Sequence, residues 1–96
     1  MATRTSLAAK PLHHGRYQLT SRVRQQGEHG YERANGIPVR LERRVDGRWQ
    51  RVRDLALTTV HGRAVVIVDS PGRYRAVVHA DGNHGGSTSK PVSVGG

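Results

Sequence analysis

The stretch "VDSPGRYRAVVHADG", Val68–Gly82, decides the fold, because it predicts a tight turn followed by a strand. Pro71-Gly72 is a turn-forming pair, and the residues behind it run into valines, which favour strands. Tyr74 stands near the start of this strand, between Arg73 and Arg75. One strand is not stable alone, so the rest of the chain must supply partners for it.

The composition favours strands and one small domain. The chain has 96 residues, of which 34% are hydrophobic, and it contains neither phenylalanine nor cysteine. Its core therefore depends on Val, Leu, Ile, Ala and a few aromatic residues, without help from a disulfide. No segment shows the apolar spacing of an amphipathic helix. We expect one all-β domain over residues 1–96, with strands from about residue 5 to about residue 94.

The charge is strongly positive and is carried by arginine. The formal net charge is +9, and only Lys10 and Lys90 among the 16 basic residues are lysines. The bias has two explanations, namely GC-rich codon usage and a need for bidentate contacts to carboxylate or phosphate groups. No apolar run is long enough for a signal peptide or a membrane-spanning helix, so we expect no membrane insertion.

Period-two alternation between glycine-bearing turns predicts seven to eight antiparallel strands, as in a sandwich or barrel. The expected strands are residues 5–9, ended by Pro11, and then 15–23, 37–45, 49–60, 63–68, 73–80 and 87–94. The polar, glycine-rich stretch 24–36 is expected to be the longest loop. In the second strand Tyr17, Leu19, Ser21 and Val23 share one face.

The pair Asp46-Gly47 predicts a two-residue hairpin turn, because such a turn needs positive φ at both positions. Counting outward sets Arg44 opposite Trp49 and Glu42 opposite Arg51. If Val39, Leu41 and Val52 face the core, the outer face carries the following residues: Arg40, Glu42, Arg44, Trp49, Arg51 and Arg53.

One residue breaks this alternation. Arg43 falls on the inner side of the hairpin. We expect its side chain either to snorkel at the end of the sheet or to sit at a bulge.

The segment "DSPGRYRA" resembles a feature of immunoglobulin-like sandwiches. In those domains a tyrosine near the start of the sixth strand turns its hydroxyl back onto the preceding turn. Asp69, Gly72 and Tyr74 match this pattern, with Ala76 where antibody-type domains carry a cysteine. The wider chain is similar to bacterial immunoglobulin-like and fibronectin-III-like modules of secreted, cell-surface and phage structural proteins. The resemblance implies an immunoglobulin-like β-sandwich, with Asp69, Gly72 and Tyr74 as a structural corner.

Histidines are the only candidates for catalysis or metal binding. His13 and His14 are adjacent, so strand alternation would turn them to opposite faces. A tight loop holds His79, Asp81, Asn83 and His84, but its Asp-Gly-Asn run is turn chemistry and a complete ligand set is not evident. We expect no metal, no cofactor, no catalytic residue and no essential role for His84.

The remaining candidate is the basic outer face, which Arg73 and Arg75 would join if their strand pairs with 40–45. The residues expected to bind a partner are Arg40, Arg44, Trp49, Arg51, Arg53, Arg73 and Arg75. Such a face could dock on an acidic protein or bind nucleic acid. It could also be a solvated surface in which Glu42 pairs with Arg51 and Arg44 covers the indole.

Three functions follow from these features. The favoured one is a non-catalytic structural or attachment module, an accessory or decoration subunit of a larger assembly such as a phage capsid or tail, made in the host cytoplasm. Its partner would be an acidic, repeated protein surface. The alternatives are a module of a secreted or cell-surface protein, for adhesion or carbohydrate binding, and a basic nucleic-acid-binding protein.

Overall fold

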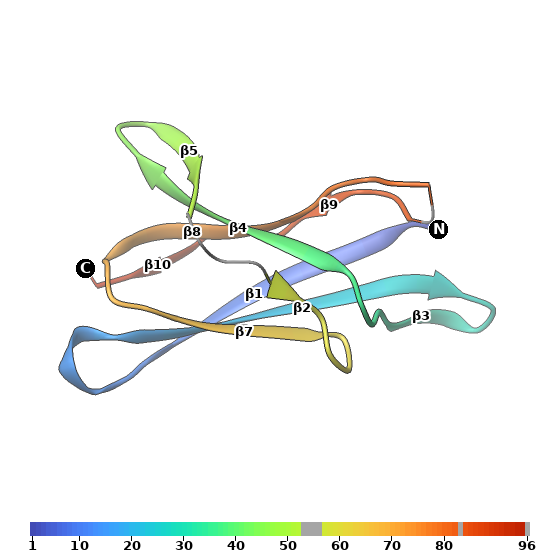
Figure 1. Ribbon diagram of the computed structural model, residues 1–96, viewed down its shortest axis with the longest axis horizontal. Coiled ribbons are helices and arrows are strands. Elements are labelled where there is room, and N and C mark those ends of the chain that lie inside the picture. Colours follow the sequence, from blue (N-terminus) through green and yellow to red (C-terminus); the bar gives the residue numbers. More distant parts are fainter. Residues whose placement is uncertain (53–56, 83, 96) are drawn as a thin grey trace.

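A computed structural model describes residues 1–52, 57–82 and 84–95 (Figure 1). Antiparallel strands make up 63% of the structure and the described residues form no α-helix, which confirms the all-β class. The strands are β1 (Thr3–Pro11), β2 (Tyr17–Gly27), β3 (Gly30–Arg33), β4 (Pro38–Val45), β5 (Arg48–Arg51), β6 (Leu57–Thr58), β7 (Arg63–Val68), β8 (Gly72–Val78), β9 (Ser87–Thr88) and β10 (Val92–Val94). A 3-10 turn, η1 (His13–Gly15), joins β1 to β2.

The strands form two sheets. In the first, β2 pairs with β1 along one edge and with β7 and then β3 along the other. In the second, the order is β10-β8-β4-β5, with β6 also paired to β4 and β9 also paired to β8. Each central strand therefore has partners on both sides, and the chain crosses repeatedly between the sheets.

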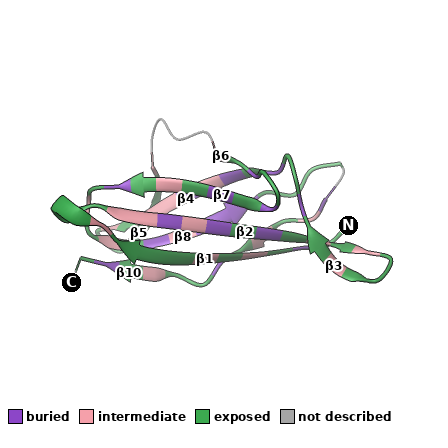
Figure 2. Cartoon of the chain, turned by 90° about the horizontal axis from the view of Figure 1, so that it is seen from below, coloured by how far each residue is buried: buried purple, intermediate pink, exposed green. Residues whose placement is uncertain are grey.

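Both sheets supply the core. One cluster joins Val23 and Ala64 of the first sheet to Val39 and Val78 of the second. A second cluster is built in the same way and contains Leu19, Leu41, Val68, Tyr74 and Val94. Figure 2 shows the result on β2, where buried and more exposed residues alternate between β1 and β7. The predicted alternation along β2 and the expected inward positions of Val39 and Leu41 on β4 are thus confirmed.

The hairpin at Asp46-Gly47 has the predicted register. Arg44 lies opposite Trp49, and Glu42 lies opposite Arg51. Asp46 and Gly47 adopt φ values of 52° and 77°, as the turn requires. A second turn has the same pair of signs at His61 and Gly62, with φ values of 52° and 77°.

The expected long loop over 24–36 is wrong. β2 continues to Gly27 and pairs with β3, so that Gln26 lies opposite Tyr31. Gly30, at a φ of 112°, closes the turn between them. Polar side chains are compatible with a strand here, because only one face of an antiparallel hairpin needs to be apolar. Pairing with β3 also gives the backbone of β2 hydrogen-bonding partners.

Two other expected boundaries change. β1 includes Pro11 because it is an edge strand, where the missing N–H of proline costs no ladder hydrogen bond. His13 and His14 do not alternate along a strand. They are exposed in η1, where His14 has a φ of 63°.

The single strand expected at 87–94 is interrupted, and its pairing continues through a side chain. Ser89 separates β9 from β10 and is buried. Its hydroxyl accepts a hydrogen bond from the Ala76 N–H at 2.9 Å, while its own N–H donates to the Ala76 carbonyl at 2.9 Å. The strand expected at 49–60 is likewise described as two pieces, β5 and β6, and its residues 53–56 lie outside the described part of the chain.

Candidate functional site

The tyrosine corner is present. Tyr74 is only 1% exposed, and its hydroxyl donates a hydrogen bond of 2.7 Å to the carbonyl oxygen of Ser70. Gly72 has a φ of 140°, which side-chain-bearing residues rarely adopt. Asp69 is exposed beside the turn. Tyr74 and Gly72 thus shape the turn from β7 to β8, while the structural role expected of Asp69 stays a prediction.

At this corner, the inward-facing Arg43 finds hydrogen-bond acceptors for its guanidinium group. Its Nε and Nη2 atoms donate to the carbonyl oxygen of Pro71 at 3.0 and 2.7 Å. The arginine therefore snorkels at the end of the sheet, the first of the two expected solutions. Burial raises the pKa of the Tyr74 hydroxyl, and the nearby charge of Arg43 opposes this rise.

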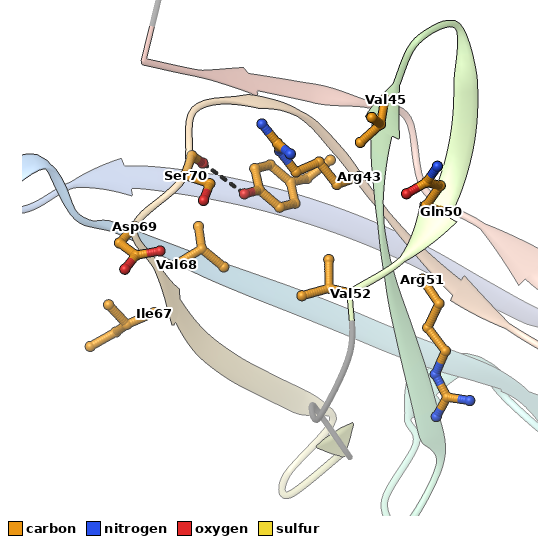
Figure 3. A pocket seen from close by; sticks show the side chains of 10 residues that line it. Arg43, Val45, Gln50, Arg51, Val52, Ile67, Val68, Asp69 and Ser70 are labelled. Carbon is orange, nitrogen blue, oxygen red and sulfur yellow. Dashed lines mark hydrogen bonds between the residues drawn. The ribbon is translucent and has the colours of Figure 1, made fainter.

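An open hollow of about 350 Å³ lies next to the corner, between β5 and the end of β7 (Figure 3). Val52 and Val68 form apolar walls, Asp69 lies at one side, and the side chain of Arg51 points away from the centre. The dashed line in Figure 3 ends at Ser70 and marks the hydrogen bond of the corner. Among the described lining residues, no nucleophile is paired with a base.

The outer face of the second sheet carries an ordered cluster around Trp49. Arg75 of β8 lies with its guanidinium carbon 4.4 Å from the centre of the Trp49 ring, and Arg44 of β4 lies at 5.8 Å. Both distances fall within the range of cation–π attraction. The side chains of Arg44, Trp49 and Arg75 are called the Trp49 surface below.

Glu42 fixes one arginine of this surface. Its Oε1 accepts a hydrogen bond of 2.7 Å from Nε of Arg75 and forms an ion pair with Nη2 at 2.7 Å. Glu42 therefore pairs with Arg75 and not with Arg51, the partner considered under the solvated-surface alternative. Both arginines lie opposite Glu42, on its two neighbouring strands. Arg75 is the one that contacts the carboxylate, and it also lies over the Trp49 ring.

The other predicted binding residues lie around this surface without joining it. Arg51 and Arg73 are exposed, and Arg40 is half-buried opposite Val77. Arg53 lies outside the described residues. Of the predicted binding residues, the structure thus brings together Arg44, Trp49 and Arg75, and their role in binding stays a prediction.

A second arginine cluster, which sequence reasoning missed, lies on the outer face of the first sheet. Arg24 of β2 is opposite Arg4 on one side and Arg33 on the other, and Arg22 is opposite Arg63. All five side chains are exposed. We call Arg4, Arg22, Arg24, Arg33 and Arg63 the β2 arginine cluster. Only the pairing of β1, β3 and β7 with β2 reveals it, because its members are scattered along the sequence.

His84 is a structural residue, contrary to the expectation that it is dispensable. It is 7% exposed. Its Nε2 lies 3.0 Å from the carbonyl oxygen of His79, and its Nδ1 lies 3.1 Å from the Asp81 carboxylate. The Asp81 carboxylate also accepts a hydrogen bond from the His84 N–H at 3.0 Å. Both ring nitrogens are thus engaged within the loop.

Comparison with protein-family models and with curated proteins finds no match to this chain. Among the described residues, no three His, Asp or Glu side chains are grouped so as to hold a metal ion. The same part of the chain contains no helix with the length and hydropathy needed to span a bilayer. Function must therefore be inferred from the surfaces themselves.

Proposed function

We propose that the chain is an immunoglobulin-like β-sandwich that works as a non-catalytic attachment module and docks on an acidic protein surface through the Trp49 surface. The fold assignment is supported by the tyrosine corner and by the sheet pairings, in which β2 lies between β1 and β7 while β8 lies between β10 and β4. A repeated acidic assembly, such as a phage capsid or tail, is the setting in which a small module of this kind is retained by many modest contacts.

The docking proposal rests on the contacts that hold Arg75 against the ring of Trp49. Arg75 is held by Glu42 on one side and lies over the indole on the other. The side chains of Arg75 and Glu42 are only 29% and 12% exposed, so their geometry is already restricted before any partner arrives. A restricted side chain loses less entropy on binding, and Trp and Arg are the residues that most often dominate protein interfaces.

The charge around Trp49 indicates the sign of the partner. Glu42 neutralises Arg75, while Arg44, Arg51 and Arg73 have no carboxylate partner among the described residues. Three uncompensated arginines around one aromatic anchor match an acidic surface with an apolar recess. A face that only contacts solvent would gain little from these contacts, because each exposed ion pair contributes only about 0.2–1 kcal/mol to the free energy of unfolding.

The experiment compares binding to the native assembly for three forms of the tagged chain. Wild type should co-sediment with a large complex from its native host. Arg44→Glu with Trp49→Ala should shift the chain to the free fraction while leaving its circular dichroism spectrum unchanged, because both side chains lie on the outer face. The matched control is Arg48→Glu, a charge reversal on the same hairpin that does not alter the Trp49 surface.

The outcomes separate the alternatives. A double variant that folds and co-sediments like wild type places the contact elsewhere and rejects the proposal. Equal loss in the double variant and the control would indicate dependence on net charge alone. Trp49 is the single tryptophan of the chain, so a change in its emission on titration with the isolated partner gives an independent readout of contact at this surface.

A further inference from the structure

The β2 arginine cluster stands apart from the Trp49 surface and requires its own explanation. It combines Arg4, Arg24 and Arg33 in one row across three strands with Arg22 and Arg63 in the next row. Neighbouring strands are about 4.8 Å apart, and the two rows are separated by two residues, or about 6.8 Å, along β2. Five positive charges therefore occupy one small area at the end of the molecule where β3 and the N-terminus lie (Figure 1).

Within the described part of the chain, no acidic residue forms an ion pair with this cluster. Among the described residues the salt bridges are those of Arg75 with Glu42 and of His84 with Asp81, and neither involves the cluster. Glu32 is the acidic residue of β3, but its carboxylate lies over Gly27, where an added Cβ would be 2.7 Å from its Cδ. Like charges directly opposite one another on a sheet are destabilising. The fold thus carries a repulsion that an external anion would relieve.

The backbone holds these arginines outward. Arg4 lies between Thr3 and Thr5, whose hydroxyls contact the Ser87 hydroxyl at 2.8 and 2.6 Å on the inner side. The guanidinium of Arg4 lies 4.0 Å from the ring centre of Tyr31, which fixes its direction. On β2, the buried Val23 separates the exposed Arg22 from the exposed Arg24. The strand alternation therefore keeps the five arginines on one face, and the ring of Tyr31 gives Arg4 a contact there.

Two hollows border the central arginines. One, of about 270 Å³, is lined by Arg22, Arg24, Arg33 and Arg63 with parts of the His61-Gly62 turn. The other, of about 410 Å³, is lined by Arg4, Arg22 and Arg24 with Thr5 and Ser6. The described residues of both linings include no carboxylate. Arg22 and Arg24 form a ridge between them, so an extended anionic chain could be contacted from both sides.

We propose that the β2 arginine cluster binds the phosphodiester backbone of a nucleic acid. A folded protein partner is less suited to it, because the centre of a protein interface is depleted of charge and needs apolar anchors. Protein–nucleic acid interfaces are instead polar and strongly positive. Arginine also matches phosphate geometry through two parallel N–H donors. The contacts recognise the backbone, so binding is not expected to depend on sequence.

The test measures fluorescence anisotropy of a labelled 20-base-pair DNA duplex, and separately of one of its strands, over a range of salt concentrations. Full engagement of five phosphates predicts a log–log salt slope of magnitude up to about 4.5 on the duplex, at about 0.9 per phosphate. The variant Arg22→Gln, Arg24→Gln, Arg63→Gln should lower that slope by about 2.7 and weaken binding by about tenfold or more at low salt. The tighter of the two probes identifies the form of nucleic acid.

Three controls make the result decisive. Replacing Arg16, Arg48 and Lys90 by Gln removes the same charge from exposed positions outside the cluster and should change affinity by less than about twofold. The variant Arg22→Lys, Arg24→Lys, Arg63→Lys keeps the charge and should keep most of the salt slope. Because Trp49 lies on the other sheet, its emission should not change when DNA binds.

The contrary results are distinct. Absence of binding by wild type at low salt, or equal weakening in the cluster variant and its charge-matched control, overturns the proposal. Displacement of DNA by poly-glutamate as readily, charge for charge, as by unlabelled DNA would assign the cluster to an acidic polypeptide instead. A change in Trp49 emission on DNA binding would move the site to the Trp49 surface. None of these results depends on whether the Trp49 surface docks on a protein.

Discussion

Arg43 on β4 holds the carbonyl oxygen of Pro71 with two hydrogen bonds, of 3.0 and 2.7 Å, across the end of the second sheet. The neighbouring carbonyl, that of Ser70, is held by the Tyr74 hydroxyl at 2.7 Å. Two inward-facing side chains from adjacent strands thus bind consecutive carbonyls of one turn. Arg43 and Tyr74 lie opposite each other in the ladder. Arg43 therefore holds the same turn as Tyr74 and belongs to the corner.

Replacing Arg43 should destabilise this corner. Arg43→Met keeps the apolar stem and removes both donors, and we expect a loss of about 1 kcal/mol in the free energy of unfolding, since the bonds are partly exposed to water. The measurement is the urea midpoint. Arg48→Met, on the same hairpin and exposed, should stay within about 0.5 kcal/mol of wild type. Equal midpoints for the two variants would show that the Pro71 contact contributes nothing.

Tyr74→Phe should cost roughly 1–2 kcal/mol through the lost hydrogen bond to Ser70. The ring would still fill its buried place, so binding through the Trp49 surface should be unaffected. Tyr31→Phe is the control, because the Tyr31 ring is contacted through its face by Arg4. A denaturant midpoint that Tyr74→Phe leaves unchanged would remove the corner from the account of stability.

The same tyrosine predicts how stability depends on alkaline pH. Burial raises the pKa of Tyr74 above its ordinary value of 10.0. The folded protein therefore keeps the phenolic proton more tightly than the unfolded chain, and the associated stability is complete below pH 10 and is lost as the pH rises through the folded pKa. Urea midpoints between neutral and strongly alkaline pH should fall more steeply for wild type than for Tyr74→Phe. Parallel curves would contradict this.

The hairpin and the corner were predictable because local chemistry determines them. Asp46-Gly47 sets a register by the φ values that its turn requires, and Tyr74 reaches a carbonyl only four residues away. The hairpin of β2 with β3 was missed because polarity was taken as a loop signal over 24–36. The turn at His61-Gly62 follows from the sequence as well, because the expected strands 49–60 and 63–68 leave only these two residues between them, and both have positive φ.

The Trp49 surface and the β2 arginine cluster also differ in how far local sequence predicts them. Arg44 and Trp49 are placed by a single local hairpin, whereas the partner of Glu42 depends on which of two neighbouring strands offers the better site. The β2 arginine cluster requires three long-range pairings at once. Sequence alternation identifies which residues point outward, but it does not identify which outward residues become neighbours.

His84 should prove important for the stability of its loop. His84→Ala leaves the His79 carbonyl and the Asp81 carboxylate without the imidazole, and we expect a loss of about 1–2 kcal/mol in thermal or urea unfolding. His29→Ala, at an exposed turn position, should behave like wild type. Chelator treatment should leave the melting temperature unchanged, because both ring nitrogens already have protein partners. A drop of several degrees on chelation would instead indicate a metal ligand.

Removing either of two buried hydroxyls, those of Ser21 and Thr59, should change the free energy of unfolding in opposite directions. Ser21 is 2% exposed, and its Oγ has no hydrogen-bond partner among the described residues. Ser21→Ala should therefore raise the free energy of unfolding by about 1 kcal/mol, because it removes an uncompensated polar group. Thr59 is equally buried, but its hydroxyl accepts from the Ile37 N–H and donates to the Ala34 carbonyl. Thr59→Val should lower the free energy of unfolding by about 1–3 kcal/mol, since both groups lose their partner.

Urea titration measures both changes, with a constant slope showing that the extent of unfolding is the same. The pair is its own control, because each substitution removes one hydroxyl from the interior at little change in volume. If Ser21→Ala destabilised the protein as much as Thr59→Val, the Ser21 hydroxyl would have to be satisfied in solution, and water would have to reach the inner face of β2 between Leu7 and Ala64, its neighbours on β1 and β7.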